Sequence, residues 1–126
     1  MPKIFEIYVQ THFSAAHFLE GYPGDCARIH GHNWAVEVFV RCRSLDKIGI
    51  GMDFRDIKKA VKEVVEGLDH RTLNEVEAFH GVNPTSENIA MFLYHALGAR
   101  LASEGTRVAR VKVSETPGAG VSYWEE

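Results

Sequence analysis

Residues 30–42 alternate in character, and this alternation restricts the possible folds more than any other pattern in the chain. The even-numbered positions share one face and carry His30, His32, Trp34, Val36, Val38, Val40 and Cys42. A period of two is typical of a half-buried β-strand. The strand is therefore predicted to begin with two inward-facing histidines before its apolar packing starts.

A second strand is predicted over residues 5–17 by the same reasoning. Its odd-numbered positions are mostly apolar and end in another histidine: Phe5, Ile7, Val9, Thr11, Phe13, Ala15 and His17. Residues 19–29, between the two segments, are rich in glycine, proline and aspartate, which indicates a loop. If the two strands are antiparallel neighbours, the three histidines meet at one end of the sheet.

Two amphipathic helices are predicted in the middle of the chain. The first is capped by Asp53 and runs to about Gly67, and its apolar positions recur at helical spacing: Phe54, Ile57, Val61, Val64, Val65 and Leu68. Thr85 caps the second helix, Glu87 lies in its first turn, and Gly105 marks its exit. The apolar stripe of this helix consists of Ile89, Phe92, Leu93, Ala96, Leu97 and Leu101.

Strand alternation returns near the C-terminus. One face of residues 107–115 carries Ala109, Val111, Val113 and Glu115, and a last short strand after the TPGAG turn carries Val121 and Tyr123. The resulting order of elements predicts an α+β fold, with a four-stranded antiparallel sheet and two helices packed on one face. The length of 126 residues, without a repeat or a linker, predicts a single domain over residues 1–126.

Charge and hydropathy argue against several classes of protein. A net charge of -3 without a basic run lacks the electrostatic footprint of a nucleic-acid binder. No apolar run approaches the roughly 18 residues of a membrane span, and the N-terminus lacks a signal-peptide pattern. We therefore expect a cytoplasmic protein with neither nucleic-acid nor membrane partners. Two cysteines are too few for a disulfide framework, and Cys42 is assigned to the core because it continues a buried face.

His17, His30 and His32 are the candidate metal ligands. Two imidazoles at positions i and i+2 of a strand project to one side, and a third from the neighbouring strand gives the three-histidine set of a catalytic zinc site. The alternative is that each is an ordinary packing or surface histidine. Cys26, four residues before His30, is open to three interpretations: a fourth ligand of a closed structural site, a nucleophile or base beside the metal, or an inert thiol.

Further candidates lie outside the strand starts. In LDHRTLNE, Asp69 fits a carboxylate that fixes the tautomer of His70 and so builds a base or proton relay, although such dipeptides also occur by chance. Glu115 ends an apolar strand face, so it either has a partner such as a histidine, a cation or ligand N–H groups, or lies in solvent. Thr85 fits a helix cap, whose N–H groups could also hold an anionic or carbonyl-bearing ligand. The remaining histidines are interpreted as surface or packing residues: His12, His80 and His95.

Six short motifs follow the order and spacing of a known family: FSAAH (13–17), CARIHGH (26–32), GIGMDF (49–54), LDHRTLN (68–74), PTSEN (84–88) and SET (114–116). On these motifs the chain resembles the 6-pyruvoyltetrahydropterin synthase / 6-carboxytetrahydropterin synthase family over nearly its whole length. Within that family, the Cys-x-x-x-His-Gly-His spacing is most similar to the bacterial 6-carboxytetrahydropterin synthases of queuosine biosynthesis. The resemblance implies the tunnelling fold (T-fold), in which sheets of several subunits close into a barrel, usually a homohexamer of two trimers with active sites between subunits.

The resemblance also implies roles for individual residues. It implies that Zn²⁺ is bound by His17, His30 and His32 and that the general base is Cys26. It also implies that Asp69 and His70 form the relay, that the catalytic Glu115 anchors the pterin, and that Thr85 and Ser86 line the pterin pocket.

The reaction implied by the resemblance is zinc-dependent cleavage of 7,8-dihydroneopterin triphosphate to 6-carboxy-5,6,7,8-tetrahydropterin, with release of acetaldehyde and triphosphate. No redox cofactor is implied, and the sequence has no dinucleotide fingerprint or phosphate loop. One alternative is a pyruvoyl-forming synthase, which eliminates triphosphate and keeps all three side-chain carbons. Another is a structural zinc module without catalytic activity, with Cys26 as the fourth ligand.

Overall fold

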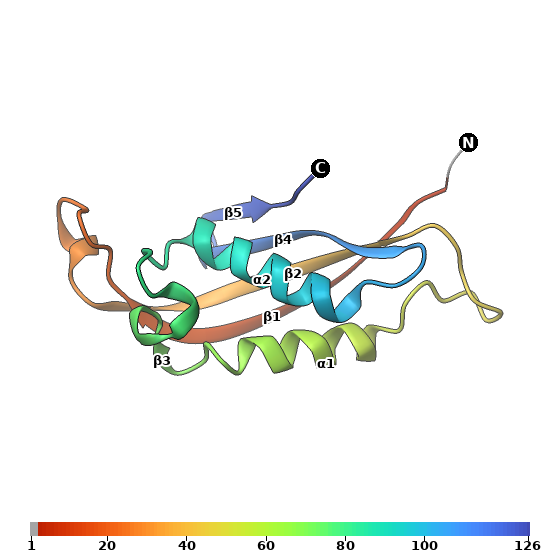
Figure 1. The fold of residues 1–126 in the computed structure, drawn as a ribbon, viewed down its shortest axis with the longest axis horizontal. Coiled ribbons are helices and arrows are strands. Elements are labelled where there is room, and N and C mark those ends of the chain that lie inside the picture. The colour runs from red at the N-terminus through yellow and green to blue at the C-terminus, as the bar shows by residue number, and fades with distance from the viewer. Residues whose placement is uncertain (1–2) are drawn as a thin grey trace.

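The computed structural model describes residues 3–126, which fold into a β-sheet layer and a helix layer (Figure 1). The elements, in chain order, are β1 (Phe5–His17), β2 (His30–Cys42), α1 (Phe54–Val65), β3 (Arg71–Thr72), α2 (Ser86–Leu101), β4 (Thr106–Thr116) and β5 (Ala119–Tyr123). Three single-turn 3₁₀ helices lie in the connections: η1 (Asp25–Ala27), η2 (Leu73–Glu75) and η3 (Glu77–Phe79).

The sheet has the strand order β3-β1-β2-β4-β5, with β1, β2, β4 and β5 antiparallel as predicted. The prediction of a purely four-stranded antiparallel sheet is wrong in one respect, because β3 adds a fifth, parallel strand beside β1. The connection that leads into β3 is held to β1 through the backbone of Ser14, whose N–H donates to Asp69 Oδ1 at 2.9 Å and whose carbonyl accepts from His70 N at 2.6 Å. Two residues are too few for an alternation that sequence reasoning could detect.

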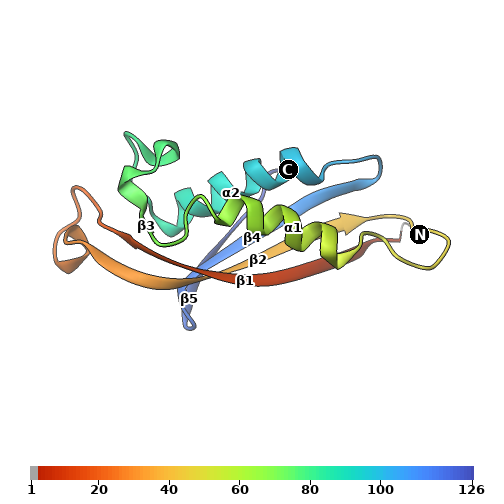
Figure 2. The ribbon, with the colours of Figure 1, turned by 90° about the horizontal axis from the view of Figure 1, so that it is seen from below.

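Both helices cover the same face of the sheet, as Figure 2 shows. Asp53 caps α1 by accepting from Arg55 N, and Thr85 caps α2 by accepting from Asn88 N, as the sequence predicts. The core between the layers is apolar, and its largest fully buried apolar side chains are Trp34, Phe13, Ile57, Leu68, Leu73, Ile89, Leu93 and Leu97. In the described part of the chain, neither helix is long and apolar enough to cross a membrane.

Two details of the predicted core are corrected by the structure. Phe54, in the first turn of α1, is 57% exposed, because it lines an open surface recess with Phe5 and Leu45 and does not pack between the layers. In β4, a bulge opposite β2 takes Ala109 out of the buried face, and Val108 is buried in its place. Beyond the bulge the predicted face is kept, as Val111 and Val113 are buried.

Candidate active site

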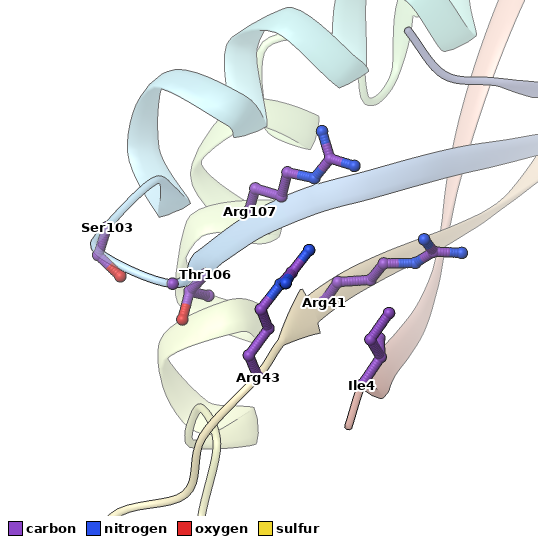
Figure 3. Close-up of a pocket in the computed structure, with 7 residues that line it drawn as sticks. Ile4, Arg41, Arg43, Ser103, Thr106 and Arg107 are labelled. Carbon is purple, nitrogen blue, oxygen red and sulfur yellow. The ribbon is translucent and has the colours of Figure 1, made fainter. Parts of the chain in front are cut away.

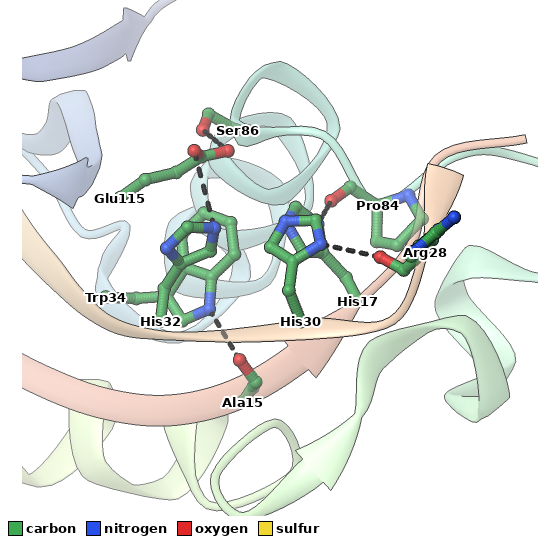
Figure 4. A network of polar contacts seen from close by, with 9 residues as sticks. All are labelled: Ala15, His17, Arg28, His30, His32, Trp34, Pro84, Ser86 and Glu115. Atoms are coloured by element: carbon green, nitrogen blue, oxygen red, sulfur yellow. Dashed lines mark hydrogen bonds and ion pairs between the residues drawn. The ribbon is translucent and has the colours of Figure 1, made fainter. Parts of the chain in front are cut away.

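The three candidate ligands come together at the end of the sheet where β1 finishes and β2 begins (Figure 4). His17 is the direct cross-strand partner of His30, and His32 lies two residues further along, opposite Ala15. Their ring centroids are 4.6 to 5.3 Å apart, and one nitrogen of each ring lies within 4.8 Å of the others. The strand register alone therefore assembles a three-histidine cluster that could hold a metal ion.

Backbone carbonyls fix the orientation of two of the rings. His17 Nδ1 lies 2.8 Å from the Pro84 carbonyl oxygen, and His30 Nδ1 lies 2.7 Å from that of Arg28 (Figure 4). A carbonyl oxygen can only accept, so each Nδ1 carries the proton and each Nε2 keeps its lone pair. Metal-bound histidines typically use this arrangement, in which one ring nitrogen is held by an acceptor and the other is free to coordinate.

Part of the cluster is also desolvated. His17 is 1% exposed, and the Nε2 atoms of His17 and His32 are buried without a hydrogen-bond partner among the described residues. Burial lowers the pKa of His17, and the neighbouring His30 lowers it further, although the hydrogen bond to Pro84 acts in the opposite direction. Leaving a buried polar nitrogen unpaired costs about 1–3 kcal/mol, a penalty that coordination to a cation removes. A donor set of three imidazole nitrogens fits zinc.

Trp34 separates the histidines from the apolar core. Its side chain is fully buried and lies edge-on to His17 and His32, with centroid distances of 4.9 and 5.1 Å. The indole Nε1–H donates to the carbonyl of Ala15 at 3.2 Å, which satisfies its polar atom. Because Trp34 is the next inward position of β2, it holds the rings above it in place.

Glu115 extends from β4 toward the same cluster. Its Oε2 lies 3.5 Å from His32 Nε2, and its Oε1 accepts from Ser86 Oγ at 3.3 Å (Figure 4). The Glu115 side chain is 36% exposed, so the carboxylate is neither fully buried nor free in solvent. A carboxylate of this kind can still accept further hydrogen bonds from a ligand. Ser86, which is buried at the start of α2, orients it.

Asp69 and His70 form a pair on the connection between α1 and β3. His70 Nδ1 lies 2.9 Å from Asp69 Oδ2, and the His70 side chain is 81% exposed. The Ser14 N–H, more than His70, holds the pKa of the Asp69 carboxyl below its ordinary value. His70 has φ 58°, in the left-handed region that is uncommon for residues other than glycine. The pair is thus fixed at its base and open to solvent at its tip.

The Asp69–His70 pair does not reach the histidine cluster within one chain. Over residues 3–126, no hydrogen bond or ion pair joins Asp69 or His70 to His17, His30 or His32. His70 and His32 do line a common shallow recess of about 470 Å³, together with residues of β1, β2 and β3. The cluster and the pair therefore occupy the same end of the sheet without direct contact.

Cys26 lies in η1, on the connection that starts at His17 and ends at His30. Its thiol is free and half-buried, and it is not part of the group of close metal-binding atoms in residues 3–126. That geometry favours an open three-histidine site over a closed one with a cysteine ligand. Cys42, by contrast, is buried in the core as predicted.

Two asparagines that the sequence reasoning missed hold this connection in place. Asn74 donates to the carbonyl of Phe18 and accepts from its N–H, at 2.9 and 3.0 Å. Asn83 makes the same pair of bonds with Glu20, at 2.9 and 2.8 Å. Each side-chain amide thus bonds both the N–H and the carbonyl of one residue, as the backbone of a neighbouring strand would. The only sequence signal for them was their place within or beside the LDHRTLN and PTSEN motifs.

The structure leaves the remaining histidines away from the cluster. His12 and His80 are exposed, and His95 is exposed on α2, where its Nε2 contacts Glu125. These positions agree with their interpretation as surface residues.

Comparison with known proteins gives a consistent result. The model of the family "6-pyruvoyl tetrahydropterin synthase" matches residues 6–126. A relative from Bacillus subtilis, named 6-carboxy-5,6,7,8-tetrahydropterin synthase, is 34% identical over 123 residues, covering 92% of this chain and 82% of its own. Another from Pyrococcus furiosus, named dihydroneopterin monophosphate aldolase, is 39% identical over 87 residues, covering 69% of each chain.

The fold is similar to that of a solved family member. The structure of Caenorhabditis elegans 6-pyruvoyl tetrahydropterin synthase superposes with a TM-score of 0.88 at 28% identity, covering 98% of this chain and 97% of that one. The two helices and the mixed five-stranded sheet of this chain are consistent with the T-fold expected from the motifs. The chain therefore belongs to the 6-pyruvoyl tetrahydropterin synthase family.

Proposed function

We propose that the protein is a zinc-dependent lyase that converts 7,8-dihydroneopterin triphosphate and one water molecule to 6-carboxy-5,6,7,8-tetrahydropterin, acetaldehyde and triphosphate. The observation that carries this proposal is that the two histidines of the Cys-x-x-x-His-Gly-His segment bring their ring nitrogens together with that of His17. The activity would take place in the cytoplasm and feed queuosine or 7-deazapurine biosynthesis.

His17, His30 and His32 would hold the zinc ion through their Nε2 atoms. Bound there, zinc supplies Lewis acidity toward oxygens of the substrate side chain. The chain's own contribution is to orient the rings so that their Nε2 lone pairs face the ion. The carbonyls of Pro84 and Arg28 do this for His17 and His30.

Cys26 and His70 are the groups that we assign to proton transfer. The half-buried Cys26 thiolate would accept a proton from a side-chain carbon or hydroxyl of the substrate and return it in a later step. Asp69 would accept the Nδ1–H of His70, which leaves His70 Nε2 free to exchange a proton with the substrate. A carboxylate that fixes the tautomer in this way makes the imidazole ready to act as a base.

Glu115 would anchor the pterin by accepting hydrogen bonds from its amino and ring N–H groups. Ser86 supports this role because its hydroxyl already orients the carboxylate. Thr85, at the cap of α2, would line the same pocket. A carboxylate that accepts two parallel N–H donors gives the directional recognition that a planar ring requires.

We further propose that the complete site forms between subunits of a homohexamer made of two trimers. The missing contact between the Asp69–His70 pair and the histidine cluster supports this assembly, since a second copy could supply the pair. The edge strands β3 and β5 leave backbone groups available for pairing with other subunits.

Two other reactions have support from relatives. A pyruvoyl-forming synthase would eliminate triphosphate and keep the three-carbon side chain, as the name of the C. elegans protein suggests. An aldolase acting on dihydroneopterin monophosphate would cleave a carbon–carbon bond without triphosphate release, as the name of the P. furiosus relative suggests. A structural zinc module is disfavoured because Cys26 stands apart from the three nitrogens.

Product identification tests the proposal directly. Purified, zinc-loaded protein is incubated separately with 7,8-dihydroneopterin triphosphate and with the monophosphate, and the products are analysed by mass spectrometry and an acetaldehyde assay. We expect acetaldehyde and 6-carboxytetrahydropterin from the triphosphate. A pyruvoyl product without acetaldehyde, or turnover of the monophosphate alone, would assign one of the other two reactions.

A further inference from the structure

Three arginines surround a recess at the end of the sheet opposite the histidines (Figure 3). The recess has a volume of about 320 Å³ and is lined by Ile4, Arg41, Arg43, Ser103, Gly105, Thr106 and Arg107. It lies where β2 ends and β4 begins, so most of the residues that line it belong to these strands or lie next to them in the sequence. None of the residues that line it is acidic.

The strand register places like charges directly opposite one another. Arg41 on β2 is the cross-strand partner of Arg107 on β4, and Arg43, the first residue after β2, lines the same recess. Directly opposed like charges destabilise a sheet. A bound anion between the guanidinium groups would remove this repulsion.

Too few carboxylates are available to neutralise the cluster. Arg41 and Arg110 share the single carboxylate of Glu6, at 3.4 and 3.3 Å. Arg43 and Arg107 form no ion pair with any residue in the part of the chain that the structure describes. The local positive charge is notable in a chain whose net charge is -3.

The chemistry of the recess matches a short phosphate chain. Planar guanidinium groups bind phosphate oxygens through paired charge-assisted hydrogen bonds. The hydroxyls of Ser103 and Thr106 add neutral donors at the rim. A volume of about 320 Å³ is at the small end for ligand sites, which suits a diphosphate rather than a larger molecule.

We propose that this recess is a binding site for an oligophosphate anion, either free pyrophosphate or the diphosphate of a nucleotide. Within one chain it is separate from the histidine cluster. The 13 residues of β2 lie between them, which corresponds to about 40 Å along an extended strand. The inference goes beyond the proposed lyase function and does not depend on it.

Isothermal titration calorimetry with pyrophosphate and with ADP tests the site on the full chain. The site variant is Arg43→Gln with Arg107→Gln. The matched control is Arg55→Gln with Arg100→Gln, which removes the same charge from exposed arginines on α1 and α2. We expect the site variant to lose about ten-fold or more in pyrophosphate affinity, the effect of one charge-assisted hydrogen bond or more. The control should bind like the unmodified protein.

Stronger binding of pyrophosphate than of ADP would identify the free anion as the ligand, and the reverse order would identify a nucleotide. The proposal fails if the unmodified protein binds neither, or if the control loses as much affinity as the site variant. It also fails if His30→Ala with His32→Ala abolishes pyrophosphate binding, since the anion would then occupy the histidine site. A thermal melt without ligand at low salt provides a second measurement. There the site variant should be at least as stable as the unmodified protein, because it removes opposed like charges.

Discussion

The histidines of the candidate site and its proton-transfer residues are held by different parts of the fold. His17, His30 and His32 stand on two long paired strands, above the buried Trp34. Cys26 and His70 stand on connections, where one thiol is half-buried and one imidazole is 81% exposed. Regular strands fix side chains through register, whereas connections can change position when a substrate or a second subunit binds.

Because of this difference, we expect metal binding and turnover to be separable. The nitrogens for a metal ion are complete in one chain, but the groups assigned to proton transfer are not assembled around them. A change on the strands should remove both properties, and a change on the connections should remove only turnover. The following experiments test that separation.

The largest effect is expected for His30→Ala with His32→Ala. Removal of two of three ligands should lower the zinc content from about one ion per chain to almost none, and turnover should be lost with it. Zinc is measured by mass spectrometry after dialysis. His12→Ala with His80→Ala is the matched control, since both side chains are exposed and away from the cluster. Full zinc retention in the ligand variant would contradict the metal site.

Cys26→Ala should affect turnover alone. Loss of a general acid–base group lowers the rate by about 10²–10⁴-fold, while zinc content should stay unchanged. Rates are measured with the triphosphate substrate and zinc with the same dialysed samples. A collapse of zinc content and folding would instead make Cys26 a structural ligand and the site closed.

Asp69→Asn should change the pH dependence of stability and leave the zinc content intact. The Asp69 carboxyl has a lowered pKa in the native state, chiefly through the Ser14 N–H. Its stabilising contribution is therefore present above the ordinary aspartate pKa of 3.8 and is lost as the pH falls through the lower native value. Urea denaturation at neutral pH and near pH 3 should show a smaller acid loss in the variant. An equal loss in both proteins would mean that the Ser14 contact is not maintained in solution.

Thr85→Ala should have the smallest effect. Loss of the cap on α2 costs about 1 kcal/mol of stability, and Thr85→Ser should recover it. Asp53→Ala, which removes the corresponding cap of α1, should cost a similar amount. Thermal melts measure both. A zinc affinity that falls in the Thr85 variant but not in the Asp53 variant would show that the turn holding Pro84 also positions His17.

The sequence was sufficient to predict the parts of the site that depend on strand periodicity. The inward positions of His30 and His32 follow from a period of two, and the position of His17 follows from pairing the two strands. The caps at Asp53 and Thr85 were also predictable, because their side chains act locally.

Other parts of the site leave no periodic signal. The carbonyls of Pro84 and Arg28 orient two rings, but every residue has a carbonyl, so the sequence cannot single them out. The contact between Ser86 and Glu115 joins residues 29 positions apart and depends on how α2 packs on β4. The bulge that displaces Ala109 changes the buried face without any glycine to indicate it.

The direct pairing of His17 with His30 also has a consequence for how the chain reaches its native state. A slip of β2 by one residue against β1 would turn the two histidines of β2 to the opposite face and separate them from His17. An ion that needs all three nitrogens would thus bind the correctly paired hairpin and no misaligned one. By mass action, metal available during synthesis would then favour correct strand alignment over misfolded alternatives.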